Sequence, residues 1–144
     1  MASQIGFVLV SHDKPAQLLR LVRRLGSLYD DPPIVCHHDF SKSKLDGLHF
    51  PSEVKFVRPN IVTKWGNISC FSAFILGLRT MYERTDSPDW FVFLSGSDYP
   101  IRSAADVHAE LAQGGFGFSQ VLWGRMVGHG QSKGRGAAVG AEQG

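Results

Sequence analysis

Residues 90–100 read Trp-Phe-Val-Phe-Leu-Ser-Gly-Ser-Asp-Tyr-Pro, an apolar run that breaks into small polar residues, an acid, an aromatic ring and a proline. An apolar run without polar alternation is typical of a strand buried on both faces, as in parallel sheets flanked by helices. Ligands of open α/β sheets collect beyond the carboxyl ends of such strands. We therefore expect a binding site at residues 95–98.

Apolar spacing on either side of this run predicts the remaining elements. Further strands are expected at residues 5–10, 34–37 and 54–57, and helices after Pro15, over 67–84 and from Ser103 to about residue 111. The resulting order is strand, helix, strand, strand, helix, strand, helix. It predicts an α/β fold with a mostly parallel sheet and helices on both sides.

Two helices show a clear apolar face. In the first, apolar residues recur at helical spacing, and arginines lie mostly between them. In the helix over 67–84 the spacing predicts a core face of five side chains. The expected core residues are Leu18, Leu21, Val22, Leu25 and Leu28 in the first helix and Phe71, Phe74, Ile75, Leu78 and Met81 in the second.

The composition excludes several classes of protein. The chain has 144 residues, 43% of them hydrophobic, which suits one globular domain. Residues 1–114 contain equal numbers of basic and acidic side chains, so charge does not indicate nucleic-acid binding. No apolar stretch approaches the ~20 residues of a spanning helix. Cys36 and Cys70 lie in apolar runs and are expected to be buried thiols in a reducing compartment, so we expect a cytoplasmic location for the chain as given.

The last part of the sequence has a different character. Ten of the 16 glycines fall between residues 114 and 144, and the final 20 residues show no helical or strand periodicity. Such a segment buries too little apolar surface to offset its ordering entropy. We expect a domain over residues 1–114 and a disordered or non-native tail over 115–144.

Polar residues follow three of the expected strands, at 11–13, 37–39 and 95–98. If these ends converge, their side chains could bind a ribose, a base or a sugar hydroxyl. The alternative is that Asp13 and Asp98 cap helices or turns and that His12 is a solvated loop residue. Trp65, just before the second helix, could stack on a ring or could pack under a loop.

The sequence gives little support for a bound metal. In the run 37–39 only His37 and Asp39 point to the same face of a strand, and a third ligand is not apparent. The strand at residue 91 also lacks the Asp-x-Asp motif with which nucleotide-sugar enzymes usually hold Mg²⁺ or Mn²⁺. We expect no metal and no other cofactor.

Four blocks of the sequence stand out, in this order: Ile-Gly-Phe-Val-Leu-Val-Ser-His (5–12), His-Asp-Phe-Ser-Lys-Ser (38–43), Val-Thr-Lys-Trp-Gly-Asn-Ile-Ser (62–69) and Phe-Leu-Ser-Gly-Ser-Asp-Tyr-Pro-Ile (93–101). Together they resemble the core-2/I-branching β-1,6-N-acetylglucosaminyltransferase family, which includes peptide O-xylosyltransferases. The resemblance implies a GT-A-like fold, a UDP-sugar donor, and inverting, metal-independent transfer of N-acetylglucosamine or a related sugar to an acceptor hydroxyl.

The resemblance also implies roles for five residues of this sequence. His12 and Asp39 would lie near the nucleotide, and Trp65 would lie near the same cleft. Ser97 and Asp98 would form its floor, where donor and acceptor meet. The partners would be a UDP-sugar and a glycan or other hydroxyl acceptor, and membrane association is possible for full-length relatives.

Inverting transfer needs a carboxylate general base, and without a metal it needs basic side chains that stabilise the departing diphosphate. The resemblance implies that both lie after the 93–101 block, in a part of the family pattern that has no match here. A shifted reading frame, a misplaced exon or a truncation would explain the departure. We therefore expect residues 1–114 to be the nucleotide-sugar-binding half of a transferase domain, catalytically incomplete.

Two alternatives remain. One is a small Rossmann-like or flavodoxin-like nucleotide-binding module without glycosyl transfer. Residues 11–15 have no glycine to bring backbone amides close to a phosphate, which counts against this alternative. The other is a non-functional fragment with an exposed sheet edge, which would be prone to aggregate.

Overall fold

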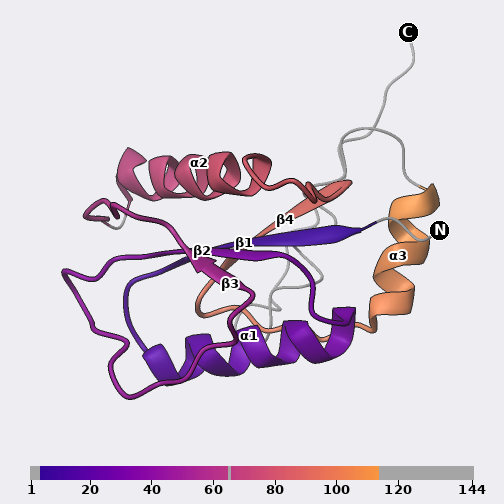
Figure 1. The fold of residues 1–144 in the computed structure, drawn as a ribbon, viewed down its shortest axis with the longest axis horizontal. Helices are drawn as coiled ribbons and strands as arrows, with labels where there is room; N and C mark the ends of the chain where they lie inside the picture. Colours follow the sequence, from indigo (N-terminus) through magenta and orange to yellow (C-terminus); the bar gives the residue numbers. More distant parts are fainter. Residues whose placement is uncertain (1–3, 65, 114–144) are drawn as a thin grey trace, which may run out of the picture.

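The computed structural model describes residues 4–64 and 66–113, which contain a four-stranded, entirely parallel sheet. Its spatial order is β3 (Val54–Phe56), β2 (Ile34–His38), β1 (Ile5–Ser11), β4 (Trp90–Ser95). Figure 1 shows α2 on one face of the sheet and α1 on the other. The expected α/β class, with a parallel sheet and helices on both sides, is confirmed.

The central strand is β1, which pairs with β2 on one side and with β4 on the other. Its residues Ile5 to Leu9 are all buried, because strands cover both its edges and helices cover both its faces. Side chains alternate between the two faces. Phe7 and Leu9 face the core beneath α1, and Val8 faces the core beneath α2.

Helix α1 (Pro15–Tyr29) begins as its sequence indicates, with Pro15 in the first turn. Asp13 does not cap it. The capping position is Lys14, in a left-handed conformation with φ of 49° and without a side-chain cap. Of the five residues expected on its core face, Leu18, Leu21, Val22 and Leu25 are buried and Leu28 is half-buried.

Helix α2 (Ile68–Tyr82) is correctly located by the sequence, but its predicted core face is wrong in part. The residues buried against the sheet are Ala73, Gly77 and Met81. Of the expected face, Met81 is buried and Phe74 and Leu78 are half-buried, whereas Phe71 and Ile75 are 63% and 47% exposed. Small residues face the sheet because the backbone approaches closely: a Cβ on Gly77 would lie 2.6 Å from Val8 Cγ1.

The prediction that the apolar run at 90–94 is buried on both faces is also wrong in part. Within the described residues β4 is an end strand, paired with β1 alone. Val92 and Leu94 are buried in the core between the sheet and α1, whereas Phe91 and Phe93 lie on the other face and are half-buried against α2. The large rings are covered from one side, as in the edge-to-face contact of Phe93 with Phe74 at 5.3 Å.

Helix α3 (Ala104–Gln113) closes the described part of the chain, near the amino end of β1 (Figure 1). Ser103 caps it as predicted, because its hydroxyl oxygen accepts a hydrogen bond from the Asp106 amide at 3.1 Å. Val107 and Leu111 join the core beneath α1. No helix within residues 4–64 or 66–113 combines the length and apolar character needed to span a bilayer.

The two cysteines and the tail are the remaining features for which the sequence gives an expectation. Cys36 is buried, and burial raises the pKa of its thiol to about 12. Cys70 is only half-buried, so its expected full burial is wrong. The tail 115–144 lies outside the described residues.

Candidate functional site

The carboxyl ends of three strands lie side by side, as their parallel pairing requires. The Asp39 amide donates to the Ser11 carbonyl oxygen at 2.9 Å, which joins the end of β2 to that of β1. The Gly96 amide donates to the Val10 carbonyl oxygen at 2.8 Å, which joins the end of β4 to β1. The segments at 11–13, 37–39 and 95–98 therefore converge on one edge of the sheet.

A cavity of about 430 Å³ opens at this edge, beside the start of α2. Its size is in the range of small-molecule sites. Val10, Phe71 and Phe74 give it an apolar wall, while polar groups come from the loops that follow the strands. The described lining residues are Val10, His12, Lys42, Thr63, Gly66, Asn67, Cys70, Phe71, Phe74 and Ser95.

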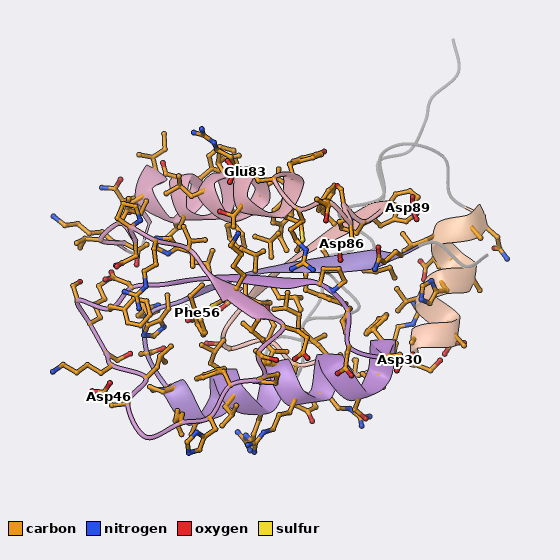
Figure 2. The ribbon with its side chains drawn as sticks, viewed as in Figure 1. Asp30, Asp46, Phe56, Glu83, Asp86 and Asp89 are labelled. Carbon is orange, nitrogen blue, oxygen red and sulfur yellow. The ribbon has the colours of Figure 1, made fainter. Side chains whose placement is uncertain are left out.

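Acidic side chains are absent from the described lining. Figure 2 places Asp86 and Asp89 on the loop before β4, toward the opposite end of the strands, and Asp46 on the loop between β2 and β3. Lys42 and His12 are the ionisable nitrogen groups among the described lining residues. The cavity therefore suits a ligand with a flat apolar part and polar or anionic substituents.

Asp39 is fully buried behind the cavity wall rather than exposed in it. Its Oδ1 accepts hydrogen bonds from the Ser41 amide and hydroxyl, at 3.0 and 2.5 Å. Its Oδ2 accepts from the Thr63 amide and hydroxyl, at 2.8 and 3.1 Å. Burial alone would raise the pKa of Asp39, but these hydrogen bonds outweigh it and bring the pKa to about 2.

Lys42 links two parts of the cavity wall. Its ammonium group donates a hydrogen bond to the Thr63 carbonyl oxygen and lies 3.7 Å from Asp39 Oδ2. The buried carboxylate thus compensates part of the charge that Lys42 brings to the cavity.

His38 fixes the loop that carries Lys42. Its Nδ1 lies 2.7 Å from the Ser11 hydroxyl, and its Nε2 lies 2.8 Å from the Ser43 carbonyl oxygen. The Ser43 hydroxyl in turn donates to the His12 carbonyl oxygen at 3.0 Å. These bonds join the loops after β1 and β2 into one wall.

The other residues predicted for the site lie as follows. The side chain of His12 is 37% exposed, lines the cavity and lies 3.7 Å from Asp13 Oδ1. Trp65 lies outside the described residues. Neither Ser97 nor Asp98 is among the described lining residues, although Ser95 is. The structure thus brings His12 to the cavity and places Asp39 behind it.

Asp98 shapes the turn that follows β4. Its Oδ2 accepts a hydrogen bond from the Ser95 amide at 2.7 Å, and its own amide donates to the Ser95 carbonyl oxygen at 3.0 Å. Burial raises the pKa of Asp98, and the Ser95 amide partly opposes that rise. Ser97 is exposed, and its carbonyl oxygen accepts from the Gln17 side chain at 3.1 Å. This geometry matches the turn-capping alternative for Asp98.

The pair considered as metal ligands is engaged otherwise. His37 Nε2 accepts a hydrogen bond from the Ile61 amide at 2.9 Å, and both carboxylate oxygens of Asp39 accept hydrogen bonds. Within residues 4–64 and 66–113 no group of three or more His, Cys, Asp or Glu side chains could hold a metal ion.

The sequence compares with known proteins as follows. The model of the Core-2/I-Branching enzyme family matches residues 34–114, more than half of the chain. The chain belongs to this family. It is 32% identical over 117 residues to xylosyltransferase 1 of Mus musculus, and 30% identical over the same length to xylosyltransferase 1 of Homo sapiens. Each alignment covers 76% of this chain and 12% of the relative, so the chain spans a small part of the relatives' length.

The family match runs from β2 through α3. It therefore includes most of the described cavity lining, from Lys42 to Ser95, and it leaves β1 and His12 outside. The recognition of the Core-2/I-Branching family from four sequence blocks is confirmed.

Several lining residues of this family member were not singled out from the sequence. Lys42 and Thr63 lie within the resembling blocks, but nothing marks them as lining until the loops after β2 and β3 are folded together. The sequence pattern instead predicts Phe71, Phe74 and Cys70 to be core residues. Their signal was the excess of apolar residues in α2, which provides more apolar surface than one sheet-facing side can use.

Proposed function

We propose that this chain is the nucleotide-sugar-binding part of a glycosyltransferase and that its donor is a UDP-sugar held in the cavity at the carboxyl ends of β1 and β4. One observation carries the proposal: the cavity lies at the strand ends where α/β sheets bind ligands, in a chain of the Core-2/I-Branching family. The same family membership favours transfer over the alternative of a nucleotide-binding module without transfer.

The lining suggests how the donor is oriented. Phe71 and Phe74 offer an apolar wall to a flat ring, and Lys42 offers a cation to the diphosphate. The amide groups at the start of α2, where Asn67 caps the helix through the Ser69 amide, add partial positive charge. The proposed binding needs no metal ion.

Catalysis needs more than these residues. In an inverting transfer, a general base removes the proton of the acceptor hydroxyl while its oxygen attacks the anomeric carbon and the bond to the diphosphate breaks. The described lining holds no carboxylate for this role. We propose that the base, and further basic groups for the diphosphate, come from sequence beyond the described residues, so that the described part binds the donor without completing transfer.

Comparing the binding of different UDP-sugars would identify the donor sugar. The relatives are named xylosyltransferase 1, which makes UDP-xylose the first donor to test and UDP-N-acetylglucosamine the second. The proposed acceptor is a hydroxyl group of a glycan or another molecule.

Calorimetric titration with UDP tests the proposal. We expect weak, sub-millimolar binding that is the same in Mg²⁺ and in EDTA. Lys42→Met should weaken it at least about fivefold, as expected for a lost charge-assisted contact. Lys44→Met is the matched control, because Lys44 is exposed, lies two residues away and is not among the described lining residues. Absence of UDP binding contradicts the proposed function, and micromolar binding that requires Mg²⁺ contradicts both its metal-free character and the incompleteness of the site.

A further inference from the structure

His37 holds part of the cavity wall without lining the cavity. Its side chain is fully buried on β2, and its Nε2 accepts a hydrogen bond from the Ile61 amide at 2.9 Å. Two residues later, Thr63 lines the cavity and is bound through its amide and hydroxyl to Asp39. The histidine therefore anchors the chain immediately before Thr63.

The geometry fixes the tautomer of His37. A backbone amide can only donate, so Nε2 carries the lone pair and the proton of the neutral ring lies on Nδ1. Nδ1 is buried and has no hydrogen-bond partner among the described residues. A buried donor without a partner opposes folding. An apolar residue in this place would avoid that cost but would leave the Ile61 amide without its acceptor.

The neighbouring histidine has the opposite tautomer. His38 Nε2 lies 2.8 Å from the Ser43 carbonyl oxygen, which can only accept, so Nε2 carries the proton. Its Nδ1 then accepts from the Ser11 hydroxyl at 2.7 Å. Adjacent buried rings with opposite tautomers provide an internal comparison for any measurement on His37.

We propose that His37 is a positioning residue of the nucleotide-sugar site: through the Ile61 amide it sets the place of Thr63, and through the Thr63 carbonyl oxygen that of the Lys42 ammonium group. This inference rests on the proposed function. The Ile61 amide donates a hydrogen bond to Nε2, and the Lys42 ammonium group donates one to the Thr63 carbonyl oxygen. Between these two hydrogen bonds, the backbone from Ile61 to Thr63 forms the connection.

The charges around His37 keep its ring neutral. Burial lowers the pKa of His37 and outweighs the opposite effects of its own backbone and of Asp39, and the neighbouring His38 lowers the pKa further. From α2, which packs on this face of the sheet, the buried residues are the uncharged Ala73, Gly77 and Met81. The lone pair on Nε2 is therefore available to the Ile61 amide at neutral pH.

Two substitutions at position 37 test the role of the acceptor in the full chain. His37→Leu fills the space without an acceptor, and His37→Gln offers a carbonyl oxygen that does not titrate. For His37→Leu we expect UDP affinity to fall at least about fivefold, because one hydrogen bond that positions the cavity wall is lost. We also expect amide hydrogen exchange at Ile61 and Thr63 to accelerate at least about tenfold, because the segment opens more easily. For His37→Gln we expect the UDP affinity and the two amide exchange rates to stay within about twofold of those of the unmodified chain. His49→Leu, at an exposed loop position, is the control and should change neither.

Unchanged affinity and exchange in His37→Leu would overturn the proposal. So would a glutamine variant as impaired as the leucine variant, because an acceptor is what the proposal requires.

The tautomers provide a test that needs no variant. Long-range proton–nitrogen NMR spectra of the chain labelled with ¹⁵N-histidine should show the proton on Nδ1 in His37 and on Nε2 in His38. A proton on Nε2 of His37 would overturn the inference even if His37→Leu does not fold. If the unmodified chain does not bind UDP, the proposed function fails, while the exchange and tautomer results still decide whether His37 anchors Thr63.

Discussion

At the residue scale, Asp39 shows how a charged group can be part of a site without facing the ligand. Its two oxygens accept four hydrogen bonds from Ser41 and Thr63, which tie the loop after β2 to the segment before α2. A buried carboxylate is tolerated here because each of its oxygens accepts two hydrogen bonds, which replace those lost from water. The sequence indicated a polar strand end here, but it gave no sign that Thr63, 24 residues later, would supply half of the donors.

Replacing Asp39 should unfold the chain more readily. Asp39→Ala removes four acceptor contacts and leaves the Thr63 amide without its bond, so we expect a loss of about 3 kcal/mol in the free energy of unfolding. Asp46→Ala is the control, because Asp46 is exposed on the following loop (Figure 2). Urea denaturation followed by circular dichroism measures both, and equal midpoints would disprove the structural role of Asp39.

The depressed pKa of Asp39 also predicts a pH dependence. The pKa of this carboxylate is about 2 in the folded chain and near the ordinary aspartate value of 3.8 in the unfolded chain. The unfolded state therefore takes up the proton first, so this stabilisation is present above about pH 3.8 and is lost as the pH falls from 3.8 toward 2. Stability curves of the unmodified chain and of Asp39→Ala should converge over that range, and a constant difference would contradict the prediction.

The buried histidines act in a higher pH range. Burial lowers the pKa of His37 and of His38 below the ordinary histidine value of 6.5, so the unfolded chain binds protons that the folded chain does not. Stability should be greatest above pH 6.5 and should fall as the pH drops below it. His37→Gln should reduce this slope in urea denaturation between pH 7 and pH 5, whereas exposed His49→Gln should not. Equal slopes in all three chains would show that His37 does not contribute.

At the element scale, α2 shows what periodicity can and cannot determine. Its apolar positions locate the helix to within one or two residues at each end, yet the side predicted to face the sheet is wrong in part. The helix packs through Ala73, Gly77 and Met81, because small residues allow close approach to Val8 and Val35 on the sheet. The volume of the side chains that face the sheet, rather than the width of the apolar stripe, decides which side of such a helix is buried.

Gly77 provides the test of this close approach. Gly77→Ala adds a Cβ 2.6 Å from Val8 Cγ1, and we expect the overpacking cost of about 1–3 kcal/mol to exceed the gain in helix propensity of up to about 1 kcal/mol. Gly26→Ala in α1 is the matched control, since its Cβ would meet only the Asp31 carboxylate at 3.1 Å. Thermal unfolding should show a lower midpoint for the first variant and an equal or higher one for the second. A rise for Gly77→Ala would mean that α2 does not pack as described.

At the scale of the whole molecule, one apolar surface and one sheet edge stand out in the described part of the chain. The outer side of α2 exposes Ile68, Phe71, Ile75 and Tyr82, and within the described residues the neighbouring strand β4 has one partner strand. Phe71 belongs to both this surface and the described cavity lining.

The apolar surface and the sheet edge predict self-association at high concentration. Ile75→Lys adds a charge to the outer side of α2, where the side chain is half exposed, and should reduce light scattering at little cost in stability. Met81→Lys places the same charge in the core and should unfold the chain. If Ile75→Lys destabilises the chain as much as Met81→Lys does, the outer side of α2 is buried after all.

The sequence by itself determined the order of the elements, the parallel α/β class and the family, because apolar periodicity, turn residues and the four motif blocks are local properties of the chain. It also marked the strand ends where the cavity lies. Only the tertiary structure decided that Lys42 and Thr63 line the cavity, that Asp39 lies behind its wall and that His37 anchors Ile61. Those facts depend on which loops meet after the sheet has formed, and the distances between residues far apart in sequence are set by strand register and helix packing.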